Sequence, residues 1–319
     1  MNDIERTTIE DTYVIWKMIL IRNKHGYSDE FANILEKIAE AMITYYGPER
    51  KETIMNAIYN THIHFQKPGE DPEEYFDNYF SLPQGINAEK DDFWAYHFSV
   101  GIPKGHKIKE ESLIYVTGQC SELDLNSNDE QLGINLQCLI HEIIHCVKSH
   151  EGFKYSGCNF LIEKASGLER VIYDTNLYMP LENKYHALNE AMTTLQEWEI
   201  YELLTNKKAN TSYSTYEYSA NVLGCMLRND QLRKVMIDAE FDKSEDWIEY
   251  IGTNEVERLE KNFEKWNNEG ICNYDDLYEY YECFRDYSPD KQYFREDSQG
   301  SNDNSQGKEL IKHSETNCE

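Results

Sequence analysis

Residues 127–149 read SNDEQLGINLQCLIHEIIHCVKS, a stretch that sets two histidines and a glutamate among aliphatic residues. Its large apolar side chains recur every three or four residues, and they are Leu132, Leu136, Leu139, Ile140, Ile143, Ile144 and Val147. This spacing predicts one long helix with a buried aliphatic face. Ser127 and Glu130 have the spacing of a capping box, so we expect the helix to begin there.

The same stretch contains His141-Glu142-Ile143-Ile144-His145, which is an HExxH pattern. Residues four apart lie on one face of a helix, so both imidazoles can bind a single zinc ion. Glu142 is rotated by about a quarter turn from His141. It can therefore take a proton from a water at the ion without binding the ion itself.

The motif alone is modest evidence for a metal site. The chain has ten histidines, and shuffled chains of this composition would contain the pattern in roughly three or four cases in a hundred. The competing interpretation is a buried helix whose two histidines are satisfied core residues. The helix cap and the long aliphatic face supply the context that a metal-binding helix requires, and a third ligand would favour it further.

A third ligand is available on a later predicted helix, residues 186–204. Its sequence LNEAMTTLQEW offers Glu190. A third histidine close behind the motif is excluded, because the residues after His145 read CVKSHEG and His150 stands at the wrong offset for HExxHxxGxxH.

The pair HEIIH and LNEAMTT resembles the gluzincin zinc metallopeptidases, in which an Asn-Glu helix supplies the third ligand. The pattern LNE-x-x-T is particularly similar to small bacterial members. The resemblance implies that His141, His145 and Glu190 bind one Zn²⁺ ion and that Glu142 is the catalytic base. Thr194, one turn after Glu190, lies on the same helical face and could support that ligand. The resemblance covers roughly residues 30 to 245.

The order of the predicted elements also resembles a zincin-like domain. Residues 28–47 are expected to form a helix capped by Ser28 and ended by Gly47. Strands at about 59–65, 92–101 and 112–118 then precede the HExxH helix, and a Gly- and Asn-rich loop follows it. We therefore expect an α+β, helix-rich fold with a small mixed sheet before the active-site helix. By resemblance, LIYVTGQC at 113–120 would be the sheet edge on which an extended substrate pairs.

Five segments are expected along the chain. Residues 1–29 would be an N-terminal helical extension, and 30–126 the helices and sheet of the zincin-like domain. Residues 127–265 would be the helical catalytic part, and 266–297 an acidic, aromatic C-terminal segment. Residues 298–319 are polar and of low complexity, which predicts a disordered tail.

The residue that stabilises the anionic intermediate is less evident. Gluzincins usually use a Tyr or a His for this purpose, and the candidates are Tyr185, His186, Tyr213, Tyr216 and Tyr218. We prefer Tyr216, which lies at the loop-to-helix start after the ligand helix. The alternative is that these tyrosines only pack.

For several other polar residues a structural interpretation is favoured over a functional one. His62 and His64 would share one face of a strand, but a half-buried strand is favoured over a metal dyad. Glu197 would share the face of Glu190 and could support the ligands, although solvated surface is the favoured interpretation. No role is assigned to three further histidines, His97, His106 and His150.

Composition limits the partners. Lys and Arg total 31 against 59 Asp and Glu, which gives a formal charge of −28. We therefore expect neither nucleic acid nor a membrane surface as a partner, whereas a cationic peptide or protein would be attracted. The oligomeric state is not indicated.

Cysteine usage and the start of the chain bear on location. The eight cysteines show no zinc-finger or redox spacing, and Cys138 and Cys146 are expected to be small core residues with free thiols. The first residues lack a signal-peptide pattern and no apolar run approaches a membrane span. A cytoplasmic location is therefore expected, while export without a signal peptide stays open.

The sequence thus favours a zinc-dependent peptidase that acts on a peptide or protein substrate. Two alternatives stay open. One is a non-catalytic zinc-binding regulatory or interaction protein built on a zincin scaffold, although an intact Glu142 argues against it. The other is a toxin-like protease delivered to a host.

Overall fold

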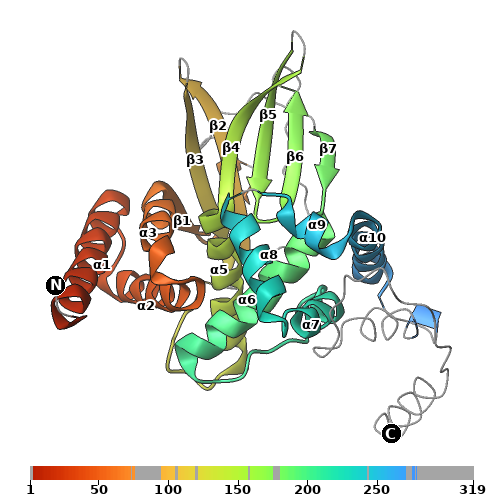
Figure 1. Cartoon of the computed structure of the whole chain (residues 1–319). Helices are drawn as coiled ribbons and strands as arrows, with labels where there is room; N and C mark the ends of the chain where they lie inside the picture. Colours follow the sequence, from red (N-terminus) through yellow and green to blue (C-terminus); the bar gives the residue numbers. More distant parts are fainter. Residues whose placement is uncertain are drawn as a thin grey trace, which may run out of the picture.

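The computed structural model describes residues 3–72, 74–75, 95–104, 107–118, 121–156, 159–174, 180–242, 244–270, 275–276 and 278. These residues form a helix-rich α+β fold with two small sheets. In Figure 1 the two sheets stand side by side above the helices. The expected class, α+β with a small mixed sheet before the HExxH helix, is confirmed at this level.

The N-terminal helices pack on one side of the molecule (Figure 1). They are α1 (Asp3–His25), α2 (Asp29–Tyr46), the 3-10 turn η1 (Pro48–Arg50) and α3 (Lys51–Asn60). The predicted bounds of α2 are confirmed, because the Ser28 hydroxyl accepts from the Phe31 backbone N–H at 3.1 Å. Gly47 ends the helix with a φ of 104°, a value that favours glycine.

The first sheet has the strand order β1-β3-β2. Strands β1 (Thr61–Phe65) and β3 (Lys107–Val116) run parallel, and β2 (Ala95–Lys104) runs antiparallel to β3. The expectation that LIYVTGQC forms the open edge is wrong. Its residues 113–116 belong to the central strand, because β1 pairs along one side of β3 and β2 along the other. The edge strand that packs on the HExxH helix is β2.

That helix is α5 (Glu130–Lys148), and its cap differs from the expectation. The N-cap is Asp129, whose carboxylate accepts from the backbone N–H groups of Gln131 at 2.9 Å and Leu132 at 3.2 Å. The Ser127 hydroxyl instead accepts from the Asp129 N–H in the preceding turn. A carboxylate at this position satisfies two free N–H groups and complements the helix dipole, so it replaces the predicted capping box.

The region between α5 and residue 185, expected to be a loop, contributes four strands to a second sheet instead. Strands β4 (Ser149–Ser156), β5 (Asn159–Ser166), β6 (Glu169–Asp174) and β7 (Pro180–Lys184) pair antiparallel in chain order. Gly167, with a φ of 59°, provides the tight turn between β5 and β6. Each strand pairs with its neighbour in sequence, and Gly152, Asn159 and Asn183 lie within these strands. The region that suggested a loop therefore contains a meander.

The second long helix, α6 (His186–Thr205), packs on α5. Buried residues surround its axis, so it forms a central element rather than an amphipathic surface helix. The helices that follow are α7 (Glu217–Met226), α8 (Asp230–Asp242), α9 (Asp246–Ile251) and α10 (Thr253–Glu269). Cys138 and Cys146 are buried with free thiols, as expected.

The expected segment boundaries are largely untested. Helix α10 crosses the boundary at residue 265, most of 266–297 lies outside the described residues, and all of 298–319 does too. His106 lies outside them as well. Among the helices described, none has the length and apolar character needed to cross a membrane.

The histidines of β1 pack with aromatic neighbours. His62 lies 5.5 Å from His25 and 6.2 Å from His64, measured between ring centroids, and His64 Nε2 lies 2.7 Å from the Glu70 carboxylate. The pair has no third metal-binding group among the residues described. Burial, and then the charges of His25 and His64, lower the pKa of His62 to about 4.

We predict that this cluster makes stability depend on pH. The unfolded state takes up the His62 proton near pH 6.5, whereas the folded state resists it until about pH 4. The free energy of unfolding should therefore fall as the pH drops from 6.5 toward 4. In His62→Phe this fall should be smaller, as measured by urea unfolding at pH 7 and pH 5. If the free energy of unfolding fell equally in the wild type and in His62→Phe, the pH dependence would not come from His62.

Candidate metal centre

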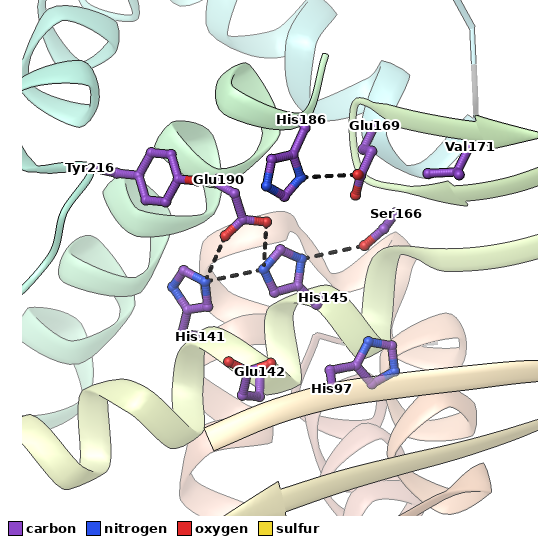
Figure 2. Close-up of a pocket in the computed structure, with 10 residues that line it drawn as sticks. All are labelled: His97, His141, Glu142, His145, Ser166, Glu169, Val171, His186, Glu190 and Tyr216. Atoms are coloured by element: carbon purple, nitrogen blue, oxygen red, sulfur yellow. Dashed lines mark hydrogen bonds and ion pairs between the residues drawn. The ribbon is translucent and has the colours of Figure 1, made fainter. Parts of the chain in front are cut away.

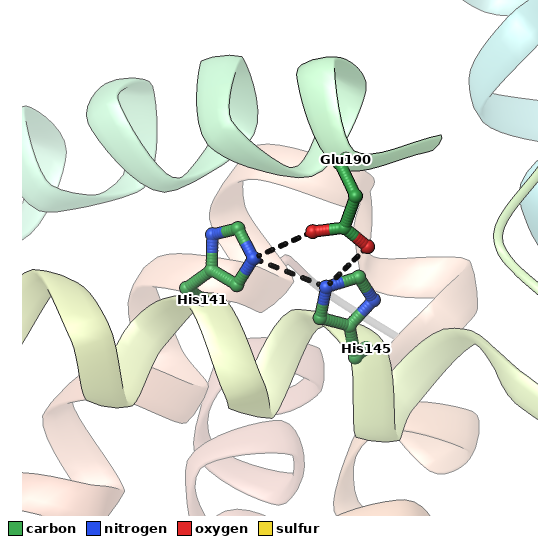
Figure 3. Close-up of side chains that lie close together, drawn as sticks. All are labelled: His141, His145 and Glu190. Carbon is green, nitrogen blue, oxygen red and sulfur yellow. Dashed lines mark hydrogen bonds and ion pairs between the residues drawn. The ribbon is translucent and has the colours of Figure 1, made fainter. Parts of the chain in front are cut away.

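Helices α5 and α6 bring His141, His145 and Glu190 together, although Glu190 comes from a different helix (Figure 3). His141 Nε2 lies 3.3 Å from Glu190 Oε2, and His145 Nε2 lies 3.3 Å from Glu190 Oε1. The two Nε2 atoms are 3.1 Å apart. Glu190 therefore lies where a third ligand to a metal between the two histidines would have to be.

These separations suit a metal ion. Zinc bonds of about 2.0–2.1 Å in a tetrahedral arrangement place neighbouring ligand atoms about 3.3 Å apart. One ligand atom from each of the three residues lies within 4.8 Å of the other two. Within the described part of the chain, no other three residues of a metal-binding type come together in this way. Two imidazoles and a carboxylate form a donor set that zinc accepts, and three protein ligands leave a position open.

The second nitrogen of each imidazole is also held. His141 Nδ1 lies 3.1 Å from Glu197 Oε2, and His145 Nδ1 lies 3.3 Å from the Ser166 hydroxyl at the end of β5. Such contacts select the tautomer and fix the ring, so that Nε2 faces the centre in both residues. Both histidines are thereby oriented for a common ion.

Glu197 was expected to be solvated surface, and that expectation is wrong. Its side chain is fully buried. Its Oε1 accepts from Gln137 Nε2 at 2.8 Å and from the Tyr213 hydroxyl, while Oε2 faces His141. The seven-residue spacing from Glu190 had placed it on the right face. Because α6 is buried on all sides, that face is interior rather than exposed.

Asn189 and Thr194, which lie on either side of Glu190 in α6, contact neighbouring segments. The Thr194 hydroxyl lies 3.4 Å from the Ser214 hydroxyl rather than against Glu190, which differs from the expected support. The Asn189 side-chain oxygen accepts from the Leu168 N–H at 3.0 Å. It therefore ties the start of α6 to the turn between β5 and β6, one residue before Glu190.

The three residues open onto a pocket of about 280 Å³ between the two sheets and the helices (Figure 2). Strand β2, helix α5, strands β5 and β6, helix α6 and the start of α7 contribute to it. Its lining residues are His97, His141, Glu142, His145, Ser166, Glu169, Val171, His186, Glu190 and Tyr216. His97 is thus part of the pocket wall, although no role was predicted for it from the sequence.

The pKa values of Glu142 and Glu190, which both line the pocket, are shifted in opposite directions. Burial raises the pKa of the Glu142 carboxyl and outweighs the lowering by His141, His145 and a hydrogen bond from the His97 backbone. Burial also raises the pKa of Glu190, but the charge of His145 and hydrogen bonds from both histidines hold it well below its usual value. Glu190 is thus ionised as a ligand must be, whereas Glu142 is shifted toward proton acceptance.

Two of the five candidates for stabilising an anion, Tyr216 and His186, line the pocket. Tyr213 donates its hydroxyl proton to Glu197. The Tyr185 ring packs edge-on against Trp247, with centroids 5.2 Å apart, and Tyr218 is exposed. None of these three tyrosines is among the residues that line the pocket.

His186 and Tyr216, the two candidates that line the pocket, have different hydrogen-bond partners. His186 Nδ1 lies 3.0 Å from Glu169, and this hydrogen bond raises the pKa of His186 to about 9. The Tyr216 hydroxyl oxygen accepts from Asn267 Nδ2 at 3.0 Å. In Figure 2 the Tyr216 hydroxyl is directed toward the Glu190 side of the pocket. Both side chains can therefore face a substrate, from different walls.

No protein-family model, no curated protein and no solved structure matches this chain. Function is therefore argued from the residues of the pocket.

The contact between Glu197 and His141 predicts that Glu197→Gln weakens zinc binding. The change removes the charge that holds the imidazole while keeping the size of the side chain. Loss of such a partner raises the zinc dissociation constant by about 10- to 100-fold, which competition with a chelating indicator would measure. Glu199→Gln is the matched control, because Glu199 pairs with Arg233 and not with a candidate ligand. Equal zinc affinities in both variants would contradict the role of Glu197.

Proposed function

We propose that this chain is a zinc-dependent peptidase of gluzincin type, built on a zincin-like scaffold and similar to small bacterial members. The proposal rests on one observation: each carboxylate oxygen of Glu190 lies 3.3 Å from the Nε2 atom of one histidine of HEIIH. Glu142 and an open pocket lie beside this group. A purely structural helix whose histidines are already held through Nδ1 would not need both Nε2 atoms to face one carboxylate. It would also have no need of a pocket in front of the histidines.

His141, His145 and Glu190 would hold one Zn²⁺ ion. When bound, zinc supplies a Lewis acid that polarises a carbonyl and makes water more acidic. Support comes from the donor set, the ligand spacing and the second contacts of both imidazoles. A site with three protein ligands is typical of catalytic rather than structural zinc.

Glu142 would act as general base and then as acid. Its carboxyl lines the pocket, and burial moves its pKa toward neutrality. It would accept the proton of the attacking water and pass it to the amine that leaves as the C–N bond breaks. Tyr216 would donate its hydroxyl proton in a hydrogen bond to the carbonyl oxygen as negative charge grows there.

The substrate would be a peptide in extended form. Strand β2 lies at the edge of its sheet, and its His97 lines the pocket while the His97 backbone bonds Glu142. A substrate strand added to β2 would therefore pass the catalytic glutamate. The formal charge of −28 favours a cationic peptide or protein as the partner.

We predict that Glu142→Gln keeps one zinc ion per chain but loses peptide cleavage. A positioned general base contributes about 10²- to 10⁴-fold, so cleavage of a diverse peptide library should fall at least 100-fold. Zinc content by elemental analysis checks that the ligands are intact. Glu249→Gln, an exposed change on α9, is the control and should cleave as the wild type does.

The outcomes separate the proposal from its alternatives. Unchanged cleavage by Glu142→Gln would remove Glu142 from the mechanism. A wild-type protein that holds zinc and cleaves no member of the library would favour a non-catalytic zinc-binding protein.

A further inference from the structure

Helix α10 reaches the pocket from outside the segment that resembles the gluzincins. It packs against α6 and α7, and near its end Asn267 Nδ2 donates to the Tyr216 hydroxyl oxygen at 3.0 Å. Tyr216 stands at the start of α7 and lines the pocket beside Glu190. One side chain of α10 is therefore bonded to the pocket tyrosine.

The direction of this hydrogen bond follows from what surrounds the amide. Asn267 Oδ1 is buried and has no hydrogen-bond partner among the residues described. If the amide were reversed, Oδ1 would accept the Tyr216 proton and the NH₂ group would occupy the buried position instead. In proteins, buried N–H groups without a partner are rarer than under-satisfied carbonyl oxygens. The orientation in which Asn267 donates is thus the favoured one.

A phenol carries one proton and also accepts hydrogen bonds on its oxygen. Since the Tyr216 oxygen accepts from Asn267, its own proton is left to point into the pocket. Tyr213 offers the contrast, because its proton is committed to Glu197. We infer that Asn267 is a positioning residue that directs the Tyr216 proton toward the substrate carbonyl. This inference rests on the proposed function.

The same face of α10 also contacts the start of α6, the helix that carries Glu190. Glu260 lies two turns before Asn267 and accepts from the backbone N–H groups of Ala187 at 3.0 Å and Leu188 at 2.8 Å. Tyr185, the N-cap of α6, makes no side-chain cap of its own. Glu260 therefore caps the helix that carries Glu190, while Asn267 holds Tyr216. A single helix sets both residues relative to each other.

The first test compares Asn267→Asp and Asn267→Leu. Both have about the size of asparagine, but the carboxylate would accept the Tyr216 proton and turn it away from the pocket, whereas leucine only removes the donor. An oxyanion donor is worth about 10²- to 10³-fold in kcat. We expect Asn267→Asp to lower the kcat of the zinc-loaded protein by about 10- to 100-fold with little change in KM. Asn267→Leu should lower it less.

The second test asks whether Asn267 acts through Tyr216. In a Tyr216→Phe background there is no proton to direct, so Asn267→Leu should lower kcat no further. Asn268→Asp adds the same charge at the next, exposed residue and should leave kcat unchanged. Circular dichroism and thermal melts of all variants check that they fold.

A third readout needs neither metal nor activity. The protein is labelled with tyrosine carrying ¹³C at Cζ, and the Tyr216 resonance is assigned by its loss in Tyr216→Phe. In the metal-free protein Asn267→Asp should move this resonance downfield, because the phenol then donates to a carboxylate. Asn268→Asp should leave it in place.

The results distinguish the inference from the proposed function. An unmoved Tyr216 resonance in Asn267→Asp, or an equal loss of kcat from Asn267→Leu with and without the Tyr216 hydroxyl, would overturn the inference while wild-type cleavage stands. If the wild type cleaves no peptide, the proposed function fails and the positioning role for catalysis fails with it. A moved resonance would then still support the hydrogen-bond arrangement.

Discussion

The placement of the polar side chains at the pocket depends on how helix α6 packs against helix α5. A carboxylate and two imidazoles inside a protein need partners, because burying them unpaired costs several kcal/mol. The crossing provides those partners by facing Glu190 toward His141 and His145. It also faces Glu197 toward the far nitrogen of His141. The same two helices thus supply the three candidate ligand atoms and some of the contacts that orient them.

The surrounding elements complete this arrangement from three sides. The second sheet contributes Ser166 behind His145 and Glu169 beside His186. The edge strand β2 brings the His97 backbone to Glu142. Helix α10 caps α6 through Glu260. The candidate centre is therefore a product of the whole fold, although its ligands come from only two helices.

Helical periodicity allowed His141 and His145 to be predicted as candidate ligands, because the four-residue spacing in HEIIH and the aliphatic face on α5 are local properties. Glu190 was predicted from the resemblance of LNEAMTT to the gluzincins. Tertiary contacts could not be predicted from the local sequence pattern. Glu197 looked like surface because burial on every side of α6 depends on α5, α7 and α10, which the local pattern does not contain. The meander β4–β7 was missed because its glycines and polar residues also suit a loop, and only pairing between neighbours resolves the two. The central place of β3 depends on β1, which joins it from far back in the chain.

The central claim is that His141, His145 and Glu190 bind one zinc ion together. Zinc K-edge absorption spectroscopy on the purified wild type and on Glu190→Ala tests it most directly. We expect one zinc per chain, with two imidazole nitrogens and a carboxylate oxygen at about 2.0–2.1 Å, and the loss of one oxygen or of the zinc itself in the variant. A wild-type protein that binds no zinc, or a zinc environment unchanged by the loss of Glu190, would contradict the account.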